Sequence, residues 1–214
     1  MKIEFKLLET DSDIANNIFR AIQSSLSTIM TKVEAEIQRR VKEILVDALR
    51  SEPEYQSLKS GILRAELGIQ NPDTVDKIIE KLSQTVTIDN IPITFTARGI
   101  KGGFRLVAIQ SDNISGLIED VDAFVSDDAK GYKLPWLEWL LLRGSDKIIK
   151  NYEVSFGSSK YSRSGMAIMK DSTSSWRVPP QFAGTIKNNW TTRAVSKAED
   201  SIQSTIISTI ENYL

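Results

Sequence analysis

Side chains that could carry out chemistry are few in this chain. Its 214 residues include no cysteine and no histidine. The lack of cysteine excludes a disulfide framework, thiol catalysis and thiolate metal sites. The lack of histidine removes the commonest general base and the commonest transition-metal ligand. A reactive site would depend on carboxylates, lysine, tyrosine or serine, so we expect no catalytic residue, no bound metal and no cofactor.

Carboxylates gather in residues 112–128, which contain six acidic residues and no basic one. Carboxylate oxygens suit Mg²⁺ or Ca²⁺, so a metal-dependent enzyme would use Asp112, Asp120 and Asp122 as ligands. The spacing does not match the Asp-x-Asp-x-Asp-Gly loop of calcium sites. A solvated acidic face is therefore the favoured interpretation.

Two short motifs resemble reactive loops. The segment Gly99–Gly103 is rich in glycine, but it lacks the spacing and the Gly-Lys-Ser/Thr ending of a phosphate-binding loop. It lies between two predicted strands, which favours a hairpin connection. The segment Ser162–Met166 has the look of a nucleophile turn, but no histidine is present to activate Ser164. A tight turn is the favoured interpretation there.

Tryptophans and basic residues suggest binding instead. Trp136 and Trp139 lie in an apolar segment, where they are either interface anchors or core residues; burial is favoured. Residues 156–197 carry seven basic residues and one acidic residue, a net charge of +6 (7 − 1). A nucleic-acid-binding module would use Arg163, Arg177 and Arg193. The net charge of the chain is −1, so docking of this basic face on the acidic face of another copy is equally natural.

A long helix is predicted to position these groups. Residues 12–49 contain no glycine and no proline, and apolar residues recur there every three or four positions. An unbroken helix would be about 57 Å long, whereas a domain of this size has a radius of gyration of about 17 Å. Either the helix breaks within Ser24–Thr31, or its apolar stripe, which includes Ile22 and Ile29, contacts a partner chain. A long helix folded across its own sheet is an equally good alternative.

The other predicted elements complete an α+β fold with one domain over residues 1–214. The helical region covers about 10–84, the sheet region about 85–178 and the C-terminal helix about 191–213. The long N-terminal helix and the C-terminal helix pack on a small, mainly antiparallel sheet, with a helical insert. The expected elements are a strand at 2–8, helices at 54–67, 73–84 and 136–142, and strands at 85–89, 91–98, 103–110, 147–156 and 165–169, with a hairpin connection at 99–102, a turn at 172–175 and a return strand at 176–178.

No apolar run approaches the roughly 18 residues that span a bilayer. The first eight residues are also too charged for the core of a signal peptide. We therefore expect a soluble, cytosolic product without a membrane partner.

The segments Ser162–Met169, Trp176–Pro179 and Phe182–Trp190, followed by an amphipathic helix, resemble tailed-bacteriophage neck proteins, also called head–tail connector or tail-completion proteins. The resemblance rests on the order of the parts: a long helix, a small sheet, a Gly-x-Ala-Ile-Met strand, an Arg-Val-Pro turn and an Asn-rich lead into the last helix. The segments Glu54–Leu58 and Gly61–Ile69 also have the look of phage structural proteins.

The resemblance implies a structural virion protein that forms part of the neck ring and joins the head connector to the tail. Its implied partners are other copies of itself, head-connector proteins on the portal side, and tail-tube or sheath proteins on the other. Genome DNA would pass through the lumen without specific binding. Such a protein is made in the host cytoplasm and resides at the head–tail junction of the virion. The alternative is a tail or baseplate subunit. The candidate interface residues are Ile22, Ile29, Asp120, Asp122, Trp136, Trp139, Arg163 and Arg177.

Overall fold

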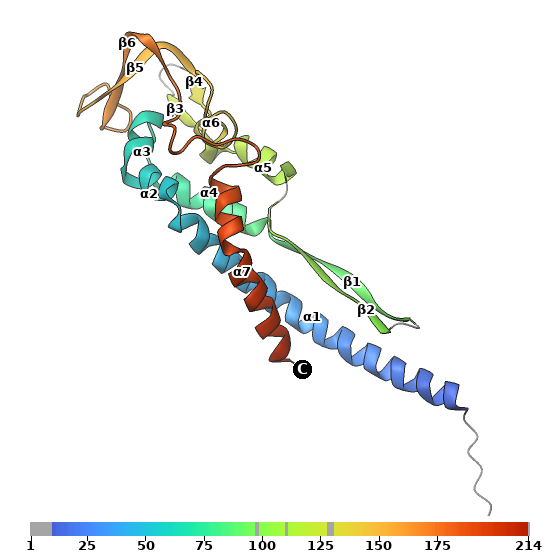
Figure 1. Cartoon of the computed structure of the whole chain (residues 1–214). Helices are drawn as coiled ribbons and strands as arrows, with labels where there is room; N and C mark the ends of the chain where they lie inside the picture. Colours follow the sequence, from blue (N-terminus) through green and yellow to red (C-terminus); the bar gives the residue numbers. More distant parts are fainter. Residues whose placement is uncertain (1–9, 97–98, 110, 128–130, 214) are drawn as a thin grey trace, which may run out of the picture.

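A computed structural model describes residues 10–96, 99–109, 111–127 and 131–213 of the chain. The fold is α+β, as predicted: helices form a long spine and a body at one end, and short antiparallel strands extend from the body (Figure 1). The strand predicted at residues 2–8 lies outside the described residues. Within the described ranges, no helix is both long and apolar enough to cross a membrane.

The spine is helix α1, Asp11–Ser51. Its N-cap is Thr10, which forms a capping box with Asp13. The helix does not break in its Ser-rich and Thr-rich part, where threonine hydroxyls donate back to carbonyls one turn earlier. It ends before Pro53, because proline cannot continue an α-helix.

Helix α7, Trp190–Glu211, runs antiparallel to α1 along the half of α1 nearest the body (Figure 1). Its start lies within one residue of the predicted position and is fixed by a box between Asn189 and Thr192. The indole Nε1 of Trp190 donates to the carbonyl of Leu49 at 3.0 Å. Under this cover, five apolar residues of α1 are fully buried: Val33, Ile37, Val41, Leu45 and Leu49.

The helical insert forms three helices: α2 (Pro53–Ser60), α3 (Ile62–Leu67) and α4 (Asp73–Gln84). The bounds of α4 agree with the prediction. The single helix predicted over 54–67 is wrong, because the chain turns at Gly61. A Cβ atom at Gly61 would lie 2.9 Å from the Cα of Ser57, so this turn needs glycine. Gly68 then ends α3 with a φ of 71°.

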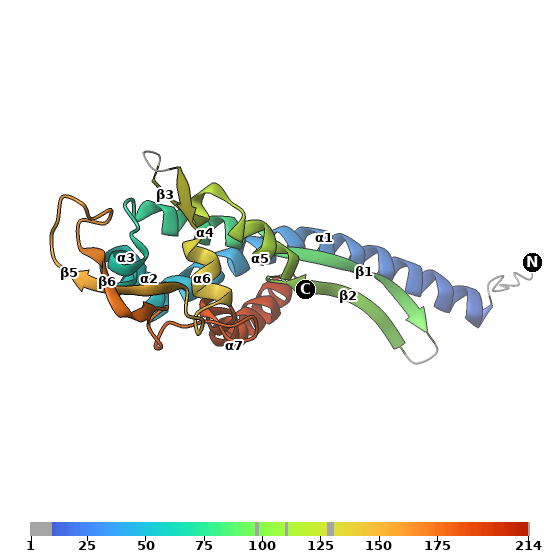
Figure 2. The same cartoon turned by 90° about the horizontal axis from the view of Figure 1, so that it is seen from above.

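Strands β1 (Thr87–Thr96) and β2 (Gly99–Val107) form an antiparallel hairpin that extends beside α1 (Figure 2). The predicted connection at 99–102 is wrong, because these residues belong to β2. Gly102 packs so closely that a Cβ atom there would be 2.6 Å from the Cα of Ile93. One face of the hairpin is half-buried, because α1 covers that side; its residues are Ile93, Phe95, Phe104, Leu106 and Ala108.

The remaining elements build the outer part of the body. They are α5 (Ser111–Ile118), the 3-10 helix η1 (Val121–Ala123), β3 (Val125–Asp127), β4 (Tyr132–Leu134), α6 (Trp136–Leu142), β5 (Ile149–Phe156) and β6 (Ala167–Trp176). The turn predicted at 172–175 lies within β6, at the place where the register of β6 on β5 shifts between Lys150 and Tyr152. The strands thus form three separate two-stranded antiparallel sheets rather than one small sheet.

Candidate interaction sites

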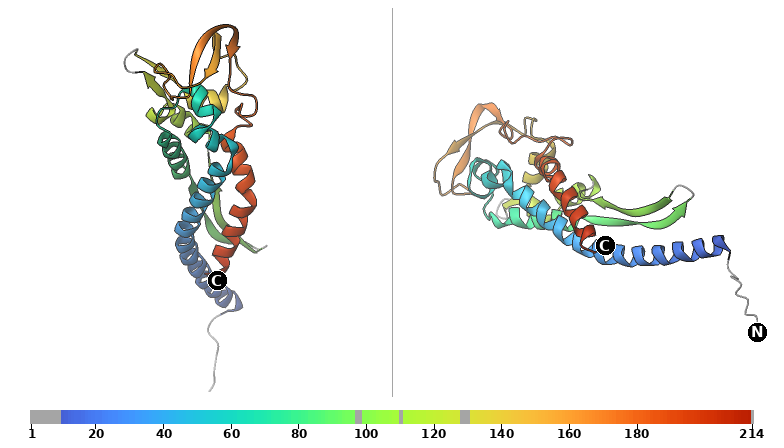
Figure 3. Two further views of the ribbon diagram at one scale, coloured as in Figure 1. Left: turned by 90° about the vertical axis from the view of Figure 1, so that its left-hand side faces the viewer. Right: turned by 60° about the horizontal axis from the view of Figure 1, so that its bottom comes forward.

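Part of α1 extends beyond the helix that covers it. Helix α7 has 22 residues and begins beside Leu49, so at 1.5 Å per residue it follows α1 for about 33 Å. Residues 11–27 of α1 continue past its end, beside the β1–β2 hairpin (Figure 3). We call these residues together with the hairpin the arm. Three large apolar side chains of α1 are exposed there: Ile18 (53%), Phe19 (45%) and Ile22 (39%).

The hairpin covers part of this helix face. The rings of Phe19 and Phe95 stack with their centroids 4.9 Å apart. The side-chain amide of Gln23 donates to the carbonyl of Ile93 at 2.7 Å. These contacts hold the hairpin on one side of α1 and leave Ile22 outside. Of the two predicted interface residues on α1, Ile22 is therefore exposed, whereas Ile29 is half-buried and packs against the core.

The exposed part of α1 is also poor in charge. Residues 14–31 contain a single charged residue, Arg20, whereas residues 32–51 contain nine. In the second half, Glu36 accepts from Arg39 and Arg40, and these hydrogen bonds lower the pKa of Glu36 to about 2. Exposed apolar surface with few charges is typical of the centre of a protein interface. The first half of α1 therefore has the composition of a contact surface.

The acidic segment is held against α4 within the same chain. The ammonium of Lys81 contacts Asp120 at 2.6 Å and Asp122 at 2.8 Å, and Lys77 lies 3.6 Å from Asp122. Asp120 also caps η1 by accepting from the amide of Asp122. The hydrogen bond from Lys81 holds the pKa of Asp120 below its usual value. A solvated acidic face is thus a wrong description of these two residues, since the Asp122 side chain is 12% exposed.

The two helix tryptophans are buried, which confirms the favoured interpretation. Trp136 has no exposed surface, and its indole Nε1 donates to the carbonyl of Asp122 at 2.9 Å. Trp139 is 8% exposed and packs against Trp176, with ring centroids 5.6 Å apart. Trp136 therefore presents no surface to a partner as an interface anchor, and Trp139 presents one edge.

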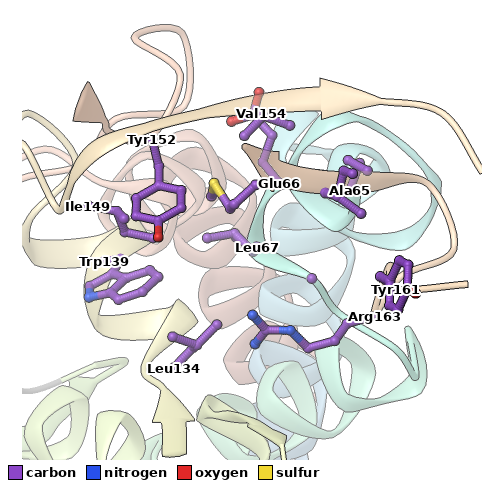
Figure 4. Close-up of a pocket in the computed structure, with 14 residues that line it drawn as sticks. Ala65, Glu66, Leu67, Leu134, Trp139, Ile149, Tyr152, Val154, Tyr161 and Arg163 are labelled. Atoms are coloured by element: carbon purple, nitrogen blue, oxygen red, sulfur yellow. The ribbon is translucent and has the colours of Figure 1, made fainter. Parts of the chain in front are cut away.

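That edge of Trp139 lines a pocket of about 600 Å³ between α3, α6 and the β5–β6 sheet (Figure 4). Ala65, Leu67 and Ala167 are the other buried lining residues. The tyrosines Tyr152 and Tyr161 are exposed and stand at its rim. A pocket of this volume, lined by both apolar and polar side chains, is a candidate binding site.

Two charged side chains reach this pocket from different elements. Arg163, predicted as an interface residue, packs across Gly68 and directs its guanidinium into the pocket (Figure 4). Glu66 accepts from the indole Nε1 of Trp176 at 2.9 Å. Burial raises the pKa of Glu66, in spite of this hydrogen bond. The structure thus brings Trp139 and Arg163 to one site.

Arg177 and Arg193 lie elsewhere, so the three arginines of the nucleic-acid hypothesis do not share this pocket. Arg177 is exposed after the end of β6.

Arg193, on α7, forms an ion pair with the buried carboxylate of Glu54, and Lys197 binds Glu52 at 2.6 Å. These two glutamates, 0–2% exposed, were missed from the sequence. Two features of the sequence could have indicated these ion pairs: the glutamates on either side of Pro53, and the basic residues Arg193 and Lys197, one helical turn apart.

Among the described residues, no group of three or more aspartates or glutamates is placed to hold a metal ion. No protein-family model matches this chain, and no curated protein or solved structure matches it.

Proposed function

We propose that this protein is a structural virion subunit of a tailed bacteriophage, located at the head–tail junction, where it forms part of the neck ring. The observation that carries the proposal is the arm. Its helix has three exposed large apolar side chains and one charge in 18 residues. Such a surface is stabilised when a partner covers it, because each buried square ångström of apolar area contributes about 25 cal/mol.

The arm suits ring assembly because it is displaced from the body. In a closed ring, a surface of one subunit meets a different surface of its neighbour. An arm that carries its apolar face away from its own core can reach a neighbouring subunit in this way (Figure 3). The first partner is therefore another copy of this chain. Head-connector proteins and tail-tube or sheath proteins are the partners above and below the ring, and genome DNA passes through its lumen without specific binding.

The test is the mass of the particle in solution. Sedimentation velocity and negative-stain electron microscopy of the purified chain should detect oligomers that populate with rising concentration. Ile22→Asp should shift this equilibrium to monomer, because it places a charge on the apolar face. A chain that remains monomeric up to about 1 mM, a concentration at which even weak contacts with a Kd in the millimolar range are populated, would contradict self-assembly through the arm.

A matched control distinguishes the effect of the added charge from the effect of its position on the helix. Ser24 is exposed two residues after Ile22 on the same helix, about 200° away around its axis. Ser24→Asp adds the same charge on the opposite side and should leave assembly unchanged. An equal loss of oligomer in both variants would mean that the added charge, and not the apolar face, disturbs assembly. Labelled subunits imaged in whole particles would separate the neck position from a tail or baseplate position.

A further inference from the structure

Helix α3 and the β5–β6 sheet, which contribute walls of the pocket, lie at the end of the molecule opposite the arm tip (Figure 1). The walls of the pocket come from segments far apart in the sequence, which the fold brings together: residues 65–68, 134, 139, 149–154 and 161–169. Arginine, tyrosine and tryptophan, the types enriched at interface hot spots, all occur in its lining. The site is therefore separate from the surface that carries the proposed ring assembly.

The polar groups of the pocket favour an anionic ligand. The Arg163 guanidinium points to the middle of the pocket, between Leu67 and Leu134 (Figure 4). A guanidinium has five N–H donors in a plane and suits carboxylate geometry, so it can bind a carboxylate in addition to other contacts. A second cation lies near a lining residue: the ammonium of Lys160 is 5.0 Å from the centroid of the Tyr161 ring.

Glu66 does not change this preference. One of its carboxylate oxygens already accepts the indole proton of Trp176. A cationic ligand that reached Glu66 would also lie in the same cavity as the Arg163 guanidinium, which would repel it. The buried apolar residues Ala65, Leu67 and Trp139 make this part of the pocket less polar than water, which strengthens an ion pair with Arg163.

We propose that this pocket binds a segment of a partner protein in which a carboxylate side chain adjoins a large apolar side chain. The apolar side chain fills the space above Leu67 and Trp139, and the carboxylate accepts from Arg163. The exposed rim of Tyr152 and Tyr161 contacts the backbone of the segment on either side. A protein segment, rather than a free metabolite, suits a pocket whose rim tyrosines remain open to solvent, 38% and 79% exposed.

Capped four-residue peptides test this proposal. The first probe contains aspartate followed by phenylalanine; the second replaces the aspartate with asparagine, and the third replaces the phenylalanine with alanine. The readout is the set of four indole N–H signals in a ¹⁵N NMR spectrum. Trp139 lines the pocket and Trp176 bonds to Glu66, whereas Trp136 and Trp190 donate to backbone carbonyls elsewhere.

The first peptide should shift the signals of Trp139 and Trp176 saturably and leave those of Trp136 and Trp190 in place. The asparagine and alanine peptides should each bind about tenfold more weakly, because each loses one of the two contacts. Equal binding of the three peptides, shifts confined to Trp136 or Trp190, or no saturable shift would each overturn the proposal. N-acetylphenylalanine is the small-molecule comparison, and tighter binding of this compound than of the first peptide would also overturn it.

The substitution Arg163→Gln should remove the preference for aspartate over asparagine while all four indole signals stay dispersed. Arg177→Gln is the matched control, because it removes the same charge from the same basic segment outside the pocket. A preference that survives Arg163→Gln, or one that Arg177→Gln abolishes equally, would show that general charge attracts the peptide. Oligomerisation through the arm should not change in either variant, so the two proposals fail independently.

Discussion

The two halves of α1 share one helical periodicity but differ in what surrounds them. The apolar residues of the second half are buried under α7 and the body, whereas those at the start of the arm remain exposed. Their sequences differ as well, because the covered half carries nine charges on its outer side and the exposed part almost none. A helix with one face exposed to water carries charged and polar residues on that face. This difference supports the proposal that a partner covers the uncharged half.

The largest expected effect on stability comes from an aspartate placed in the covered half of α1. An aspartate placed in the arm is the comparison. Leu45→Asp places an unpaired carboxylate among fully buried apolar groups and should prevent folding, since such burial costs several kcal/mol. Ile22→Asp should change the free energy of unfolding of the dilute monomer by less than about 0.5 kcal/mol. Urea denaturation at low protein concentration measures both. A large loss of monomer stability in Ile22→Asp would show that this part of the stripe is core.

The second prediction concerns the ion pairs that fix α7 to the junction between α1 and α2. Arg193→Met leaves the Glu54 carboxylate, 1% exposed, without its cation. The loss should be about 3 kcal/mol, as for one partner removed from a buried pair. Adding Glu54→Gln should recover much of it, because the unpaired charge is then gone. Additive losses in the double variant, measured by denaturation, would contradict a direct pair between the two residues.

The sequence predicted the features that depend on neighbouring residues, and it did not predict those that depend on residues far apart in the chain. Helix periodicity and proline placement gave α1, α4 and α7 nearly to the residue, because these signals are local. The glycines at 61 and 102 were misread, since their reason is a close approach of Ser57 and Ile93 that no pattern records.

The candidate sites were partly predicted for the same reason. Trp139 and Arg163 were singled out from the sequence as candidate interface residues, but their common pocket requires contacts between segments far apart in the chain. The pairing of Asp120 with Lys81 spans 39 positions. Sequence patterns carry no sign of such a pair, so the acidic segment was interpreted as a solvated face.

A smaller effect is expected at that pair, which belongs to the body and not to the arm. Asp120→Ala removes the cap of η1 and a carboxylate bound to Lys81, and should cost about 1 kcal/mol. The folded-state pKa of Asp120 is below its ordinary value of 3.8. Its contribution is therefore present above that value and is lost as the pH falls through the folded pKa. Stability curves of the two proteins should converge in acid, and a constant difference would contradict this assignment.

The smallest effect is expected at Glu66, where the sign is reversed. Burial raises its pKa above the ordinary value of 4.5. The folded chain then holds a proton that the unfolded chain has released, so stability declines as the pH rises from 4.5 through the folded pKa. Glu66→Gln keeps an acceptor for Trp176 and should stabilise the protein by less than about 1 kcal/mol at pH 7. Thermal denaturation should show this gain at pH 7 and its disappearance near pH 4; a loss at pH 7 would contradict the burial argument.

Hydrogen–deuterium exchange along α1 tests most directly the claim that half of this helix is made for a partner. Peptides covering residues 14–30 and 33–49 are compared in the dilute monomer and at concentrations where oligomers form. Amides in 14–30 should exchange faster in the monomer, because little packs on them, and should become protected on assembly. Those in 33–49 should be protected equally in both states. Protection of 14–30 that is already complete in the monomer, or that does not change on assembly, would contradict the account.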